Sequence, residues 1–252
     1  AERRAVLDVL GASVLFAVCN VAWRYGEGPT VGVVFVRALL GAALGWVLIR
    51  RRARPSWRSA LGTRSGAVAV LSAGASLVLA GTMFRSLDGP VAGLAVACTP
   101  AVAMLVRDRV GGLAGAAAVG SSVAAVVGVL IASGRSDEHA GVVWWAALVA
   151  VAFVAVEVVS RRSAQLAGEE GLDATCIVTA SMVVAAVSTA PFAVAAEAGA
   201  NSATWLSAIL AAFVVAGLGT FGRVLRTEAL PSAGVPAVAA STQVTALGTA
   251  IG

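Results

Sequence analysis

Nine long apolar segments, separated by short polar connections, constrain the fold of this chain more than any other feature. Each is close to the roughly 20 residues that cross a bilayer as an α-helix. The segments lie at residues 7–24, 30–49, 66–84, 90–106, 112–133, 141–160, 174–195, 203–222 and 230–252. They lack the alternation of apolar and polar residues that is typical of barrel strands. We therefore predict an all-α polytopic membrane protein.

The composition supports this class. Hydrophobic residues make up 59% of the chain and charged residues only 12%, with a mean hydropathy of +0.92. Soluble proteins carry about a quarter charged residues. A chain of 252 residues with this composition is too apolar to contain a large soluble domain.

The basic residues are all arginines, and their distribution predicts an orientation. With the N-terminus in the cytoplasm, only Arg24, Arg85 and Arg135 fall outside, and Arg37 lies within a segment. By the positive-inside rule this orientation is favoured. The cytoplasmic arginines cluster in loops, which argues against a nucleic-acid surface. They are Arg3, Arg4, Arg50, Arg51, Arg52, Arg54, Arg58, Arg64, Arg107, Arg109, Arg161, Arg162, Arg223 and Arg226.

A weak internal repeat divides the chain in two. The stretch 81–105, GTMFRSLDGPVAGLAVACTPAVAML, returns at 222–247 as GRVLRTEALPSAGVPAVAASTQVTAL. A repeat unit of five helices, an odd number, requires the second copy to be inverted. Arg85 outside and Arg226 inside agree with that inversion. We predict a first repeat at 1–133, a linker at 134–140 and a second repeat at 141–252. Only nine of the ten spans are present, so we expect a tenth helix to follow.

The first two segments carry a pattern of polar residues seen in a known family. In LFAVCNVAWRYGEGPTVGVVFVRALLGAALGWVLI, an asparagine is followed by a basic residue, a proline and an arginine; these are Asn20, Arg24, Pro29 and Arg37. Together with ACTPAVAML and the glycines of GSSVAAVVGVLIA, this resembles EamA-type members of the drug/metabolite transporter superfamily. The chain has Arg107-Asp108-Arg109 where that family has Gly-Glu-Arg. The resemblance implies ten helices in two inverted halves around a central cavity.

Ionisable residues within spans are functional candidates because an unpaired charge in the membrane costs several kcal/mol. Arg37 lies roughly 5 Å from the midplane, and Asn20 reaches a similar depth. Arg37 either binds an anionic substrate group or holds helices together through backbone carbonyls. Glu157, in the sixth segment, is a candidate for proton coupling or a structural ion pair with Arg161, four residues on.

Polar and aromatic residues near the centres of other spans complete the predicted site. Thr99 and Gln243 lie near the centres of the fourth and ninth segments, which the repeat relates, and such paired helices hold the site in many transporters. Phe84 supplies an aromatic wall. Trp23, Trp144 and Trp145 either do the same or form an aromatic belt at the outer interface.

No set of residues predicts catalysis, a cofactor or a metal site. The sequence has no nucleophile elbow and no lysine for a phosphate loop. His139, the only histidine, falls in the predicted linker, and Cys19, Cys98 and Cys176 lie in apolar segments as reduced thiols. We therefore predict a non-enzymatic protein without a cofactor.

The leading hypothesis is a secondary transporter in a bacterial plasma membrane that exports or exchanges a small polar or amphipathic metabolite, with proton coupling left open. Its partners would be that substrate and membrane lipids, and it would be a monomer or homodimer. The alternative is a non-transporting membrane subunit or lipid-binding partner. A polar cavity lined by Arg37, Asn20, Thr99 and Gln243 would favour transport. A core closed by Ala, Val and Leu, with those polar groups bonded to the backbone, would favour the alternative.

Overall fold

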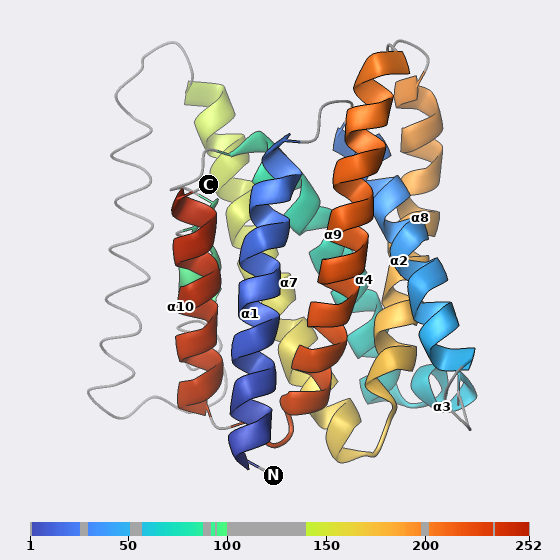
Figure 1. The fold of residues 1–252 in the computed structure, drawn as a ribbon, viewed down its shortest axis with the longest axis vertical. Helices are drawn as coiled ribbons and strands as arrows, with labels where there is room; N and C mark the ends of the chain where they lie inside the picture. The colour runs from blue at the N-terminus through green and yellow to red at the C-terminus, as the bar shows by residue number, and fades with distance from the viewer. Residues whose placement is uncertain are drawn as a thin grey trace.

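The computed structural model describes residues 2–25, 30–50, 57–87, 92–93, 95–99, 140–197, 202–233 and 235–251. Within these ranges all regular secondary structure is helical, which confirms the all-α prediction (Figure 1). The helices are α1 (Glu2–Tyr25), α2 (Thr30–Arg50), α3 (Trp57–Gly62), α4 (Arg64–Ser86), α7 (Ala140–Glu169), α8 (Ala174–Glu197), α9 (Ser202–Ala229) and α10 (Val235–Ile251). The fifth predicted span and the linker lie outside the described residues, as does most of the fourth.

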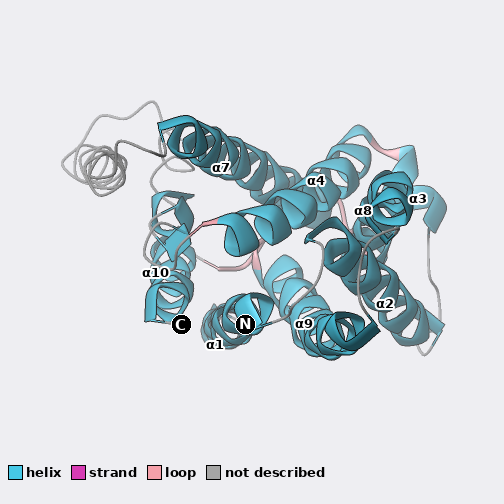
Figure 2. Cartoon of the chain, turned by 90° about the horizontal axis from the view of Figure 1, so that it is seen from above, coloured by secondary structure: helices cyan, strands magenta, loops and turns pink. Residues whose placement is uncertain are grey.

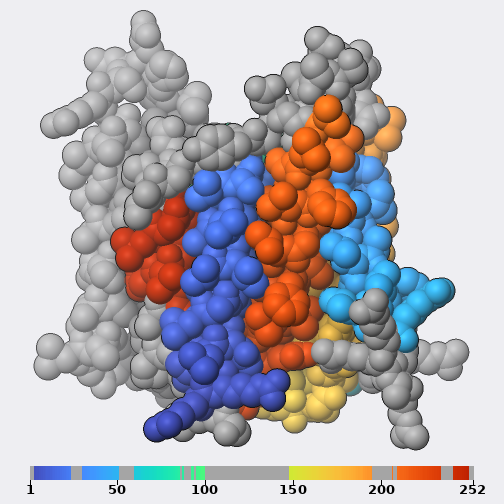
Figure 3. Space-filling model, in the orientation of Figure 1, coloured from blue at the N-terminus to red at the C-terminus, as the bar shows by residue number. Residues whose placement is uncertain are grey.

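Five of these helices are long and apolar enough to cross a membrane. Their candidate spans are Arg3–Trp23, Thr30–Arg50, Arg64–Arg85, Ala174–Val194 and Ile209–Ala229. Large apolar side chains point outward from them, such as Leu7 on α1 and Phe213 on α9, each at least 60% exposed. Figure 3 shows α1, α9 and α2 side by side on one such face. An apolar exterior around buried polar groups indicates a membrane-embedded protein.

Two helices extend beyond their predicted ends because hydrogen bonding continues after the hydropathy falls. α7 runs to Glu169, where the chain turns through Gly171, whose positive φ of 77° suits glycine. α9 runs to Ala229, two residues before Pro231. Arg223 and Arg226, expected beyond the eighth span, are therefore part of α9. Arg223 is buried, and both side chains line the interior of the bundle.

Local signals explain other helix ends. Thr63 caps α4 by accepting a hydrogen bond from the Gly66 amide at 3.1 Å. Asp173 caps α8, because its carboxylate accepts from the amides of Thr175 and Cys176 at 2.7 and 3.1 Å. Such caps satisfy amides that lack an intrahelical partner.

The helices pack in a defined set of neighbours. α2 lies against α8, α4 against α7, and α1 against both α9 and α10 (Figure 2). α9 also packs on α2, and α8 on α4. Close approach between α2 and α8 depends on Gly45, where an added Cβ would overlap the Thr179 side chain. The centre of the bundle is lined by residues of α1, α2, α4, α7, α9 and α10.

Candidate functional site

One face of α9 carries the positive charge of the site. Gly219, Arg223 and Arg226 lie at positions i, i+4 and i+7, which share a face of an α-helix. Both arginines line a partly open cavity of about 60 Å³ between the helices. A volume of this size holds a few water molecules. α9 therefore presents two guanidinium groups to the interior of the bundle.

Glu157 on α7 is the centre of a buried ion-pair network. Its Oε1 accepts from Arg161 Nε at 3.0 Å and from Arg226 Nη2 at 2.8 Å. Its Oε2 accepts from the hydroxyl of Ser76 on α4. Arg161 also donates to the Thr242 hydroxyl at 3.0 Å. We call these five residues the paired cluster; it connects α4, α7, α9 and α10.

A further contact holds Arg226 in place. Its guanidinium carbon lies 4.7 Å from the ring centroid of Phe16 on α1. A desolvated cation over an aromatic face is stabilised by roughly 2 kcal/mol. Arg226 therefore joins α1 to the paired cluster as well.

Arg37 on α2 and Arg223 on α9 differ from the paired cluster. They are 4% and 8% exposed, and the Nε of each has no hydrogen-bond partner among the described residues. The two groups lie within electrostatic range of each other. Arg37 stacks on Trp23, with its guanidinium carbon 5.1 Å from the ring centroid. We call Arg37 and Arg223 the open pair.

Glycine at position 219 makes room for Arg37. A Cβ at Gly219 would lie 2.9 Å from Arg37 Nη2, closer than real Cβ atoms approach. The missing side chain lets the guanidinium of Arg37 lie against the backbone of α9, one turn from Arg223.

Hydroxyl and amide groups of α1 and α10 line another wall. Asn20 donates to the Thr249 hydroxyl at 2.7 Å, and Thr245 donates to the Ser13 carbonyl at 3.2 Å. Asn20, Ser13 and Thr245 all line the cavity. These bonds tie α1 to α10 and leave polar groups at the cavity surface.

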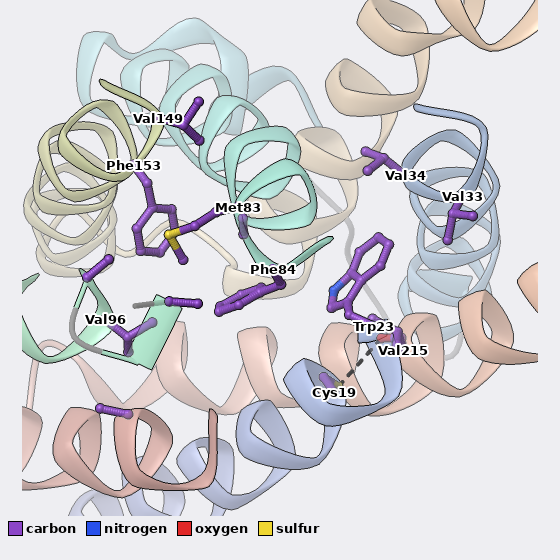
Figure 4. Packing of buried hydrophobic residues seen from close by; sticks show 14 of the residues in the cluster. Cys19, Trp23, Val33, Val34, Met83, Phe84, Val96, Val149, Phe153 and Val215 are labelled. Atoms are coloured by element: carbon purple, nitrogen blue, oxygen red, sulfur yellow. Dashed lines mark hydrogen bonds between the residues drawn. The ribbon is translucent and has the colours of Figure 1, made fainter. Parts of the chain in front are cut away.

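The cavity also has an aromatic wall. The rings of Phe84 and Phe153 meet edge to face, with centroids 6.4 Å apart and planes at 63°. Both belong to a buried cluster with Trp23 and Val96 (Figure 4). All four line the cavity. The site therefore combines guanidinium groups with an apolar surface.

The structure brings four of the six predicted site residues together. Arg37, Asn20, Phe84 and Glu157 all line the cavity. Of the two alternatives for Glu157, the ion pair with Arg161 is present in the structure, and Arg226 adds a second.

The other two predicted residues lie elsewhere. Thr99 is buried and its hydroxyl donates to the Ala95 carbonyl within its own helix, at 3.3 Å. Gln243 is exposed and donates to the Ala97 carbonyl at 3.4 Å. Neither is among the lining residues, whereas Thr242 and Thr245 of α10 are.

Trp23 is buried beside Arg37, which places it in the cavity wall rather than in an aromatic belt. The side chains of Trp144 and Trp145 lie outside the described set, as does His139. Cys19, Cys98 and Cys176 are buried, and none of them forms a disulfide with another described residue. Within the described ranges no group of three histidine, cysteine or acidic residues could hold a metal ion.

Arg223 is the site residue that sequence reasoning missed altogether. Its position after a span assigned it to a cytoplasmic loop under the positive-inside rule. One signal was available in the sequence. Between Gly222 and Pro231 there is no proline or glycine that would end a helix, so the eighth helix can continue through GRVLRTEA. Continuing the helix would have placed Arg223 and Arg226 on the face of Gly219.

Comparison with known proteins identifies no relative. No protein-family profile matches the chain, and neither a curated protein nor a solved structure matches it significantly.

Proposed function

We propose that this protein is a secondary transporter that moves a small polar or amphipathic metabolite across a bacterial plasma membrane by alternating access. The observation that carries the proposal is the central cavity, which is lined by charged side chains from several helices. Ionisable groups buried between membrane helices mark substrate or ion pathways as a rule. The protein would act without catalysis or a cofactor.

The pattern of helix packing supports two inverted repeats. If the two repeats correspond, the counterparts are α1 and α7, α2 and α8, and α4 and α9. Replacing each helix by its counterpart converts the observed contact between α1 and α9 into the contact between α7 and α4, which is also observed. The same exchange turns α2–α9 into α8–α4 and leaves α2–α8 unchanged. Members of each exchanged pair run in opposite directions in Figure 1. This is the relation expected of an inverted duplication.

The repeat-related fourth and ninth spans also meet. The Gln243 side chain of α10 donates to the Ala97 carbonyl in the helical residues 95–99. In inverted-repeat transporters the substrate site lies at the interface between the repeats. The cavity occupies such a place, because helices of both proposed halves line it.

The size of the cavity bears on the transport cycle. About 60 Å³ is well below the roughly 300–1,000 Å³ of small-molecule sites. In this proposal the structure represents a closed form, and a substrate enters after helices of one half move away from the other. Opening on one side would separate α4 from α7 and break the hydrogen bond between Ser76 and Glu157.

The alternative, a non-transporting subunit, has one observation in its favour. Thr99 and Gln243 bind backbone carbonyls, as that reading expects. Arg37 and Asn20 instead line the cavity, and Arg37 has an unpartnered Nε. The cavity lined by Arg37 therefore favours transport.

The direct test uses purified protein in proteoliposomes. A thermal-shift screen against a metabolite library first finds ligands, because a ligand that binds only the folded state raises its stability. We expect Arg37→Ala to abolish uptake of such a ligand while the control Arg50→Ala, at the exposed end of α2, retains it. Wild-type rates with Arg37→Ala would refute the assignment.

Proton coupling is tested separately. Glu157→Gln removes the only carboxylate among the described lining residues. If Glu157 couples transport to protons, the substitution removes the pH dependence of uptake. An unchanged pH profile eliminates Glu157 as the coupling residue.

A further inference from the structure

The open pair presents hydrogen-bond donors that nothing in the described structure uses. A guanidinium binds a carboxylate through two parallel N–H groups, and Nε with one Nη forms such an edge. The Nε atoms of Arg37 and Arg223 both lack a partner and both side chains line the cavity. Each of the two buried guanidinium groups therefore has at least one donor, its Nε, that an oxyanion could bind.

The charge balance of the cavity also calls for an anion. Among the described lining residues there are four arginines and one glutamate, which leaves three net positive charges. Glu157 offsets one of its two partners, Arg161 and Arg226, so one of the three net charges lies in the paired cluster and the other two lie on the open pair. Buried charges are costly unless an opposite charge is present. An anion between Arg37 and Arg223 would relieve their repulsion.

The surface next to Arg37 is apolar. The Trp23 ring lies under its guanidinium, and Phe84 and Phe153 belong to the same buried cluster (Figure 4). A strongly hydrated ion such as phosphate gains nothing from such a wall. An organic anion with an aromatic or branched apolar body buries that body there.

We propose that the substrate is a small organic carboxylate, whose carboxylate binds between Arg37 and Arg223 and whose apolar body packs against Trp23, Phe84 and Phe153. This assignment rests on the proposed transport function and specifies its substrate class. Trp23 and Gly219 position Arg37, the first by stacking and the second by leaving space.

The first experiment needs no variant. Thermal stability of the purified full chain in detergent is measured with benzoate, with benzamide as its neutral isostere, and with inorganic phosphate. We expect benzoate to raise the melting temperature in a concentration-dependent way, and benzamide and phosphate to have little effect. Equal shifts from benzoate and benzamide, or a larger shift from phosphate, would overturn the proposal.

Variants then locate the binding site. Arg37→Gln and Arg223→Gln each remove one guanidinium, and loss of a charged hydrogen bond weakens binding by about ten-fold or more. Arg50→Gln, at the exposed end of α2, is the matched control and keeps wild-type affinity for benzoate. Unchanged affinity in both cavity variants would overturn the site.

The two proposals fail differently. Benzoate binding that depends on Arg37 without any movement of radiolabelled benzoate into proteoliposomes would overturn transport and support the anion site. Transport of a neutral ligand, with no response to benzoate, would support transport and overturn the anion site.

Discussion

The paired cluster and the open pair lie in the same cavity, but they differ in how their buried charges are compensated. Glu157 accepts from Arg161, Arg226 and Ser76, so each of its oxygens has a donor. Arg37 stacks on Trp23, and Arg223 has Glu157 as well as other arginines within electrostatic range, but the Nε of each has no hydrogen-bond partner among the described residues. The first arrangement stabilises the closed bundle. The second carries a cost that a bound anion would repay, which is the expected difference between a structural group and a binding group.

The comparison is tested most strongly at Glu157. Glu157→Gln leaves Arg161 and Arg226 without their counter-charge, and breaking a buried ion pair costs about 3–5 kcal/mol. We expect a large fall in the free energy of unfolding, measured by denaturant titration in detergent. Glu169→Gln, on an exposed part of the same helix, is the control and should change stability by less than about 0.5 kcal/mol. Equal stability of the two variants would show that the paired cluster is not structural.

A methyl group on α9 tests how the open pair is positioned. Gly219→Ala places a Cβ 2.9 Å from Arg37 Nη2, whereas Gly217→Ala on the same helix meets nothing within 4 Å. Overpacking costs about 1–3 kcal/mol. Because Nη2 is the end of a long side chain that can shift, we expect Gly219→Ala to be less stable than Gly217→Ala by no more than the lower end of that range, and to bind benzoate more weakly because Arg37 is displaced. If the two variants behave alike, Arg37 is free to move and Gly219 does not position it.

The substitution Arg37→Met tests whether arginines of the open pair and of the paired cluster have opposite effects on stability. Replacing an uncompensated buried charge with an apolar side chain of similar length is neutral or stabilising, here by about 1 kcal/mol. We expect the melting temperature to stay level or rise while benzoate binding is lost. Arg226→Met, in the paired cluster, should instead lose stability. A loss of stability in Arg37→Met equal to that in Arg226→Met would place Arg37 among the structural groups.

The sequence was sufficient to predict the long helices that the structure describes, because their apolar length is a property of each segment alone. It also identified Arg37 and Glu157, since a charge within an apolar run is visible without a structure. It could not supply the Glu157–Arg226 pair, which joins residues 69 positions apart through packing. The inverted repeats and the transport function inferred from the resemblance stay predictions.

Depth along a helix can be estimated from sequence, but the direction of a side chain cannot. Gln243 was selected for its central position, and it is exposed, while its neighbour Thr242 is buried and lines the cavity. One residue turns an α-helix by about 100°, which is enough to exchange the inner for the outer face. Arg223 was missed for a related reason, since its charge suggested a loop and only helix continuation brings it inside.

The smallest expected effect concerns the wall between α1 and α10. Asn20 donates to the Thr249 hydroxyl at 2.7 Å, and interhelical hydrogen bonds in membranes contribute about 0.6 kcal/mol on average. A double-mutant cycle of Asn20→Ala and Thr249→Val, read by unfolding free energy, should give a coupling of about that size. Both single variants should retain benzoate binding within about two-fold, because the Asn20 amide is already paired and the open pair is intact. A large loss of binding in Asn20→Ala alone would extend the anion site to α1. The Asn20 amide would then bind the anion even though it already donates to Thr249 in this structure, and a group with a partner would have to be counted with the open pair.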